Sequence, residues 1–171
     1  MSIPEASRRT FLKATLGVAA AAAPSALWAQ TKSVKLGVVH PVTGALAEPG
    51  QACRLGAQMA AEAINAGGGI RALGGARLEL LLGDTQGKPE VARTEAERVI
   101  NQGAQMLLGA FDSASTAAMV PVAQQRRVPF LVDVAAADAI TANVARAVKD
   151  GLVKVQYVYR NFPTADRKSV V

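Results

Sequence analysis

Three hydroxyl side chains, those of Ser113, Ser115 and Thr116, stand together shortly after a short apolar run that ends at Gly109. A helix-forming run of Ala, Met and Val follows them as far as Gln125, so they fall at the expected start of a helix. The first backbone N–H groups of a helix have no partner within it, and with the helix dipole they attract a carboxylate. These hydroxyls therefore form a candidate anion site. An equally good alternative is that Ser115 only caps the helix.

Catalytic and cofactor motifs are missing from the sequence. His40 is the only histidine, no Gly-x-Ser-x-Gly turn supplies a nucleophile, and no His, Cys and carboxylate residues have metal-ligand spacing. The glycines at 67–69 and 74–75 follow an expected helix rather than a strand, so they do not form a dinucleotide loop, and a phosphate loop is absent. We therefore expect no enzyme activity, no metal and no cofactor. His40 is predicted to be a structural or ligand-contact residue, and Cys53 a packed small apolar residue.

Short β-branched segments alternate along the chain with longer segments of helical periodicity. The expected strands are 34–39, 78–82, 106–108, 128–132 and 153–159, and the expected helices are 50–66, 89–101, 113–125 and 138–149. The apolar flank of the first helix is Leu55, Met59, Ala63 and Ala66, and the inward positions of the second are Val91, Ala92, Ala96, Val99 and Ile100. The alternation predicts an α/β fold, a doubly wound parallel sheet with helices on both faces.

In an open parallel sheet, ligands bind at the carboxyl ends of the strands, near a reversal of strand order. The segments expected at that edge are 40–49, 84–88, 110–116 and 133–141. The third contains the hydroxyl cluster, so it is the most suggestive of the four.

The first thirty residues have the three parts of an export signal. Arg8 and Arg9 precede Phe11 and Leu12, a short apolar run of mostly Ala follows, and Ala29 provides a small residue for cleavage. The apolar run is about ten residues, whereas a spanning helix needs roughly twenty. We predict that residues 1–29 are a signal peptide of the twin-arginine type that engages the export machinery and directs the chain to the periplasm. A general secretory signal is the alternative route.

Composition argues against a nucleic-acid partner. The formal net charge is +6 with 4% aromatic residues, and the signal segment holds a net +2 of that charge, from Arg8, Arg9 and Lys13 against Glu5. The other bases are spread along the sequence, unlike the basic stripe with aromatics of a nucleic-acid binder. One cysteine excludes an internal disulfide and leaves the compartment to the signal.

Several segments together resemble the leucine/isoleucine/valine-binding family, the periplasmic solute-binding proteins of ABC transporters. Residues 35–44 resemble the family's opening strand and Pro-x-Ser/Thr-Gly loop, and residues 63–70 its Ala-Ile-Asn helix end followed by glycines. Residues 80–89 are similar to its second strand and Asp-Thr turn, and residues 157–164 to its Phe-Arg-x-x-Pro segment. The segments 109–116 and 129–141 match in placement, so the likeness covers about residues 33–164.

This resemblance implies a two-lobed type I periplasmic binding fold that closes on a small ligand and delivers it to ABC permease subunits in the inner membrane. Residues 30–165 would be the N-terminal lobe, the second lobe would be absent, and residues 166–171 would be a non-native or truncated end. The chain would thus be an N-terminal fragment.

The resemblance also implies the ligand contacts. The serine that holds the ligand's carboxylate corresponds to Ser113, with Ser115 or Thr116 nearby, and the contacts after the fourth strand fall on Ala135, Ala136 and Ala137. A family threonine appears here as Ala136, and Asp112 is also unusual. These departures widen the expected ligand to a small carboxylate, an amino acid or an amide. The alternatives are a periplasmic ligand sensor for a signalling partner, or a fragment of a doubly wound α/β enzyme.

Overall fold

A computed structural model describes residues 33–164 of the chain. The predicted signal residues Arg8, Arg9, Phe11 and Leu12, the cleavage residue Ala29 and the segment 166–171 lie outside the described residues. Within the described part, no helix has the length and apolar character needed to cross a membrane.

Strands and helices alternate throughout the described part, as predicted. They are β1 (Ser33–His40), α2 (Ala47–Ala66), the single 3-10 turn η1 (Arg71–Leu73), β2 (Arg77–Asp84), α3 (Pro89–Asn101), β3 (Met106–Gly109), α4 (Ser113–Arg126), β4 (Phe130–Val132), α5 (Ala139–Lys149) and β5 (Val158–Arg160). All strand pairs are parallel, and the order is β2-β1-β3-β4-β5. The order therefore reverses between β1 and β3, which is the position at which open α/β sheets commonly bind ligands.

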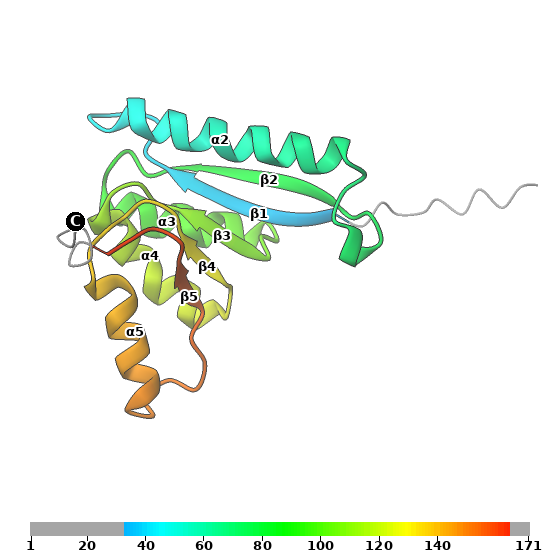
Figure 1. The fold of residues 1–171 in the computed structure, drawn as a ribbon. Helices are drawn as coiled ribbons and strands as arrows, with labels where there is room; N and C mark the ends of the chain where they lie inside the picture. Colours follow the sequence, from blue (N-terminus) through cyan, green and yellow to red (C-terminus); the bar gives the residue numbers. More distant parts are fainter. Residues whose placement is uncertain (1–32, 165–171) are drawn as a thin grey trace, which may run out of the picture. The chain divides into compact units, whose positions relative to one another are not determined.

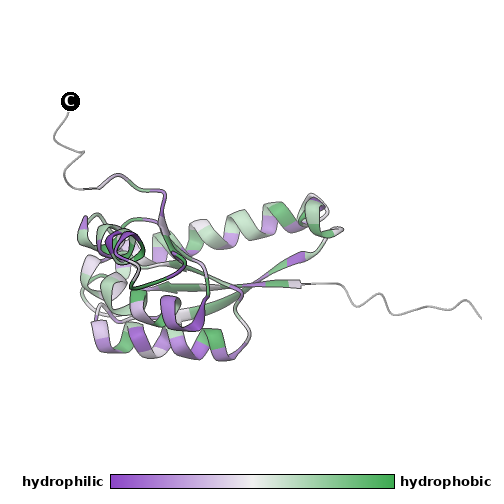
Figure 2. Ribbon diagram, turned by 90° about the horizontal axis from the view of Figure 1, so that it is seen from below, coloured by the Kyte–Doolittle hydropathy of each residue, from purple (hydrophilic) through white to green (hydrophobic). Residues whose placement is uncertain are grey.

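Helices cover both faces of the sheet, but unequally. α2 packs on β1 and β2, whereas α3 and α4 pack against each other across the other face and α5 joins α4 (Figure 1). In Figure 2 the sheet lies between α2, mostly pale green, and α3, which is banded purple and green. The predicted doubly wound α/β class is confirmed, and within residues 33–164 one helix covers one face and three cover the other.

The hydrophobic core lies between the sheet and the three helices α3, α4 and α5. Alternate strand residues point into it, and Leu107, Phe130 and Val132 are fully buried there against Ala92, Ala96 and Val99 of α3 and Met119 of α4. This confirms Ala92, Ala96 and Val99 as inward positions, while Val91 and Ile100 are only partly buried. The core thus holds the carboxyl ends of β3 and β4 side by side.

The predicted apolar flank of α2 faces outward, so that prediction is wrong. Leu55 is 56% exposed and Met59 62%, and Ala63 and Ala66 are exposed as well. Polar groups take the inward side instead: the Asn65 side-chain amide exchanges hydrogen bonds with the Leu78 backbone at 2.8 and 2.9 Å. The guanidinium of Arg54 donates to the Gly83 carbonyl. In an Ala-rich helix, periodicity identifies an apolar flank without showing which flank meets the sheet.

The last strand is shorter than predicted. Residues 153–157 form an irregular segment, and pairing with β4 begins only at Val158. The amide of Gln124 in α4 fixes this segment, accepting from the Tyr157 N–H at 2.6 Å and donating to the Val155 carbonyl at 3.2 Å. The alternation of Val with Lys and Gln in this segment is typical of a strand. The Val155 carbonyl and the Tyr157 N–H bond to the Gln124 side chain instead.

Candidate functional site

The start of α4 is capped by a residue that the hydroxyl pattern did not indicate. Asp112 is the N-cap, and its Oδ1 accepts from the Ser115 N–H at 2.7 Å. A carboxylate from the chain itself thus occupies part of the anion-attracting helix terminus. The Ser115 side chain does not cap the helix. An Asp immediately before the hydroxyl cluster was the available signal for this cap.

Two of the three predicted hydroxyls point into the protein. Thr116 is fully buried, and its hydroxyl donates to the Asp112 carbonyl at 2.7 Å, with the Ala110 carbonyl at 3.1 Å. Ser115 is also fully buried, and its Oγ has no hydrogen-bond partner among the described residues. Both side chains lie behind the helix start.

Ser113 connects the loops that follow β3 and β4. It is the first residue of α4 and only partly buried, and its Oγ accepts from the Ala137 N–H at 3.3 Å. The predicted residues Ser113, Ala135, Ala136 and Ala137 therefore come together, as parallel strand ends require. The hydroxyl proton of Ser113 stays available as a donor.

Arg160, at the end of β5, holds the second of these loops. Its guanidinium donates to the carbonyl of Ala135 at 3.0 Å and also to the carbonyl of Ala137. Ala135 is almost fully buried, while Ala136 and Ala137 are partly exposed. Arg160 thus bonds the carbonyls of Ala135 and Ala137, while Ser113 accepts from the Ala137 N–H. The Phe-Arg-x-x-Pro resemblance includes Arg160 but did not indicate which groups it bonds.

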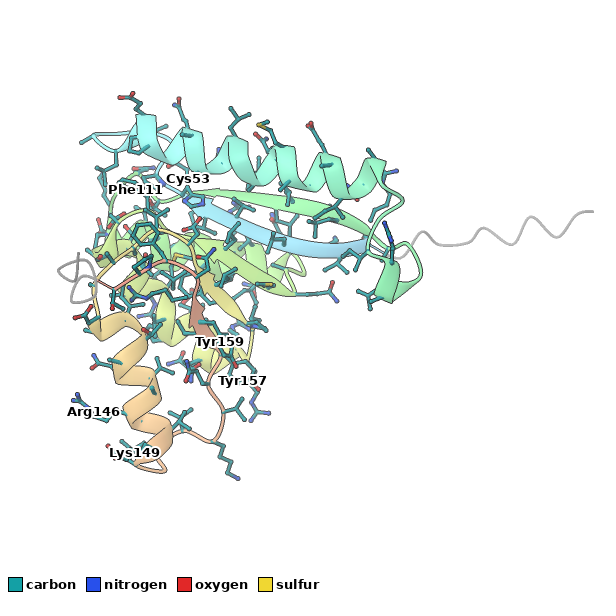
Figure 3. The ribbon with its side chains drawn as sticks, viewed as in Figure 1. Cys53, Phe111, Arg146, Lys149, Tyr157 and Tyr159 are labelled. Atoms are coloured by element: carbon teal, nitrogen blue, oxygen red, sulfur yellow. The ribbon has the colours of Figure 1, made fainter. Side chains whose placement is uncertain are left out.

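His40, predicted as a structural or contact residue, is fully buried at the end of β1. Its Nε2 lies 3.1 Å from Oδ2 of Asp133, which follows β4. Cys53 of α2 lies near this pair, and burial followed by the charge of Asp133 raises the pKa of its thiol. Figure 3 shows Cys53 and Phe111 at this end of the sheet.

The loop after β1 is fixed by Asp84, the last residue of β2. Its Oδ1 accepts from the backbone N–H groups of Val42 at 3.0 Å and Gln86 at 2.9 Å, and its Oδ2 accepts from the Thr43 hydroxyl at 2.6 Å. Burial alone would raise the pKa of Asp84, but these hydrogen bonds outweigh it and hold the pKa below its ordinary value. The carboxylate is a structural anchor whose acceptor sites are filled.

Several polar atoms at this edge are buried without a partner in the described part of the chain. Besides Ser115 Oγ and His40 Nδ1, they include Oδ2 of Asp112 and Oδ1 of Asp133. Buried polar atoms are normally paired, so this part of the edge is bonded less completely within the lobe than the loop held by Asp84. Within residues 33–164, no three His, Cys, Asp or Glu residues are grouped so as to hold a metal ion.

The open parallel sheet, with polar loops that meet where the strand order reverses, is typical of α/β lobes that bind a ligand at one edge of the sheet. Residues 33–165 match the periplasmic binding protein family, so the chain belongs to that family. Residues 5–25 match the signal sequence of the twin-arginine translocation pathway. This match confirms the predicted twin-arginine signal, and the chain is exported to the periplasm.

Individual relatives support the same assignment. The chain is 32% identical over 159 residues to a Leu/Ile/Val-binding protein homolog of Brucella suis, covering 92% of this chain and 36% of that protein. It is 34% identical over 110 residues to a leucine-, isoleucine-, valine-, threonine- and alanine-binding protein of Pseudomonas aeruginosa, covering 64% and 29% of the two chains. The chain therefore spans about a third of the length of these relatives, which are binding proteins rather than enzymes.

A solved structure has the same fold. The substrate-binding protein of a branched-chain amino acid transporter from Streptococcus pneumoniae, in complex with isoleucine, superposes with a TM-score of 0.66 at 28% identity. The match covers 78% of this chain and 34% of that one. The predicted likeness to the leucine/isoleucine/valine-binding family is confirmed.

Proposed function

We propose that this chain forms the first lobe of an extracytoplasmic solute-binding receptor of a branched-chain-amino-acid-type ABC importer, and that it performs no reaction. The observation that carries this proposal is the Ser113–Ala137 contact, which joins two loops at the switch point of an exported periplasmic binding protein. Such loops present hydroxyl and backbone donors to a small ligand without any nucleophile or base to transform it.

The lobe would comprise residues 30–165, after signal cleavage behind Ala29. The greater length of the relatives supports a second lobe that closes over the same edge of the sheet. ABC permease subunits in the inner membrane would then receive the ligand when the lobes open.

Within the lobe we assign direct ligand contact to Ser113 and to the backbone of Ala136, because the N–H and the carbonyl of Ala137 are already bonded to Ser113 and Arg160. Thr116, Ser115, Ala135 and His40 would support these groups from behind, because they are buried. The Asp112 carboxylate disfavours a second carboxylate in the first turn of α4. Among small carboxylates, amino acids and amides, we therefore favour ligands that present an amide or ammonium group beside Asp112.

A titration followed by ¹⁵N NMR on the chain purified after export tests this proposal. Leucine, isoleucine, valine, benzoate and their amides are added in turn, because a single lobe is expected to bind weakly. Shifts confined to loops 110–113 and 133–138, and lost in Ser113→Ala, support the proposal. Ser33→Ala, which removes a hydroxyl at the opposite end of the sheet, is the matched control. Chemical turnover of a ligand, or shifts confined to another surface, would contradict it.

A further inference from the structure

The amino ends of β4 and β5 carry a surface whose chemistry the ligand site does not explain. Leu152 is 78% exposed and Val155 50%, although neither lies at a chain end. The two residues line a hollow of about 510 Å³ together with Arg127, Lys154 and Tyr157. We call the surface made by Arg127, Lys149 and residues 152–157 the basic tip.

The basic tip is a fixed surface. The N–H groups of Leu152 and Val153 both donate to the Ala147 carbonyl, at 2.9 and 3.2 Å, which ties the segment to the end of α5. Gln124 holds its other end through the two hydrogen bonds described above. The aliphatic side chains are therefore held outward by the backbone.

Positive charge gathers at the same place, although the bases are spread along the sequence. The last turns of α4 and α5 and the following segments contain Arg126, Arg127, Arg146, Lys149 and Lys154, with Asp150 as the acidic residue among them. Within residues 33–164, Arg127, Lys149 and Lys154 are exposed and form no ion pair. Figure 3 shows Arg146 and Lys149 at the far end of α5, away from Cys53 and Phe111.

Helix dipoles account for only part of this pattern. Bases are favoured in the last turn of a helix, which explains Arg126, Arg146 and Lys149. The dipole explains neither Lys154, which belongs to no helix, nor two exposed aliphatic side chains among cations. Exposed aliphatic residues, a tyrosine and unpaired bases on one rigid surface are the composition of a membrane-interface site.

We infer that the basic tip docks on an anionic phospholipid bilayer. The bases would lie against the lipid phosphates, while Leu152 and Val155 would enter the boundary between headgroups and acyl chains. The carboxyl edge would then face away from the bilayer, since α4 and α5 end at the opposite edge of the sheet, so the lobe would leave the bilayer before it presents a ligand to a permease. Net positive charge alone would suit any acidic partner, but the outward Leu152 favours a bilayer over an acidic protein.

Vesicle flotation tests this inference on the chain purified after export, which lacks the signal. We expect binding to vesicles of equal parts phosphatidylglycerol and phosphatidylcholine, and at least tenfold weaker binding to pure phosphatidylcholine. Binding should be lost in about 1 M salt, where the Debye length is about 3 Å. Lys149→Glu with Lys154→Glu should weaken it at least tenfold, and Leu152→Ser several-fold. Thermal melts unchanged from the parent chain would show that these exposed substitutions leave the fold intact.

The matched control is Lys88→Glu with Arg93→Glu, which makes the same change in net charge at the start of α3. It should retain binding. Equal loss in this control would overturn the inference, as would equal binding to neutral vesicles. Soluble polyglutamate tests the alternative partner, an acidic protein, because it has the negative charge without a bilayer. If it binds as tightly as the vesicles and Leu152→Ser changes neither, the tip recognises an acidic protein and the inference fails.

Discussion

Two pairs of loops lie at the same edge of the sheet, and they differ in how completely their polar groups are paired. The loops after β1 and β2 are joined by Asp84, whose carboxylate oxygens accept from Val42, Thr43 and Gln86. The loops after β3 and β4 keep buried atoms of Asp112, Asp133 and Ser115 without a partner. The first pair is bonded within the lobe itself, whereas the second is bonded less completely.

This difference follows from how a one-sided site is built. A ligand gains affinity from donors and acceptors that are already fixed in place, and the entropic cost of ordering them is met during folding. The saturated loops and the Thr116 and Arg160 contacts supply that fixation. In the function we propose, the less completely bonded loops would carry recognition. Substitutions in α2 and at Asp84 would break the first pair of loops, and substitutions at Thr116 and Ser115 would measure how completely the second pair is bonded.

The largest expected effect comes from Gly50, where α2 meets the loop after β1. A Cβ at this position would lie 1.7 Å from the Pro41 carbonyl oxygen. Because backbone must move to accept it, we expect Gly50→Ala to destabilise the lobe by about 3 kcal/mol or more. Urea unfolding of the purified chain would measure the change.

Gly56, six residues further along α2, provides the control. Nothing lies within 4 Å of a Cβ built there, so alanine should stabilise the helix by about 0.5–1 kcal/mol. Opposite signs for the same substitution in one helix would locate the constraint at the loop. Equal effects would show that α2 is not anchored through Pro41.

The fold could be predicted from the sequence, because apolar residues recur at different spacings in strands and in helices. The two kinds of segment also alternate regularly along the chain. It also placed Ser113 and the Ala135–Ala137 loop at one edge, since parallel strands end together. It failed where side chains bond to backbone over long sequence separations. Asn65 and Arg54 turned α2 so that Leu55 and Met59 face outward, and Gln124 kept residues 153–157 from forming a strand.

The site was predicted less well for the same reason. The roles of Asp84, Asp133 and Arg160 depend on neighbours that the fold brings together, and no local pattern signals such contacts. Asp112 is different, because an Asp before a helix start is a local capping signal. The hydroxyls drew attention away from it, although Thr116 and Ser115 proved to be interior.

The next largest effect is expected at Asp84. Replacement by Asn keeps the size but removes the charge that several donors share, so Asp84→Asn should cost about 1–3 kcal/mol at neutral pH. Since the native pKa is lowered, the stabilisation is present above the unfolded pKa of about 3.9 and is lost as pH falls through the native pKa. The unfolding free energy should therefore be measured for the parent and for Asp84→Asn at a series of pH values. The difference between the two proteins should shrink as the pH falls. A constant difference down to the lowest pH would show that the charge of Asp84 is not what holds the loop.

A smaller effect is expected at Thr116, which supports the unsaturated loops from within. Thr116→Val keeps the shape of the side chain but removes the hydroxyl bonded to the Asp112 carbonyl. We expect a loss of about 1 kcal/mol in urea unfolding. Ligand-dependent shifts at Ser113 should persist, because Thr116 does not reach the surface. If binding disappears while stability is retained, Thr116 belongs to the recognition surface after all.

The smallest effect, and the most informative, is expected at Ser115. Its Oγ is fully buried and has no partner among the described residues, so the hydroxyl costs desolvation without gaining a bond. Ser115→Ala removes that cost and leaves only a small void, and stability should change by less than about 0.5 kcal/mol. Asp112→Ala serves as the reference, because it removes the carboxylate that accepts from the Ser115 N–H. This loss of the helix cap should cost about 1 kcal/mol. A loss of stability in Ser115→Ala as large as that in Asp112→Ala would mean that the hydroxyl is already bonded within the lobe. The loops after β3 and β4 would then be as saturated as those after β1 and β2, and the contrast between the two pairs would not hold.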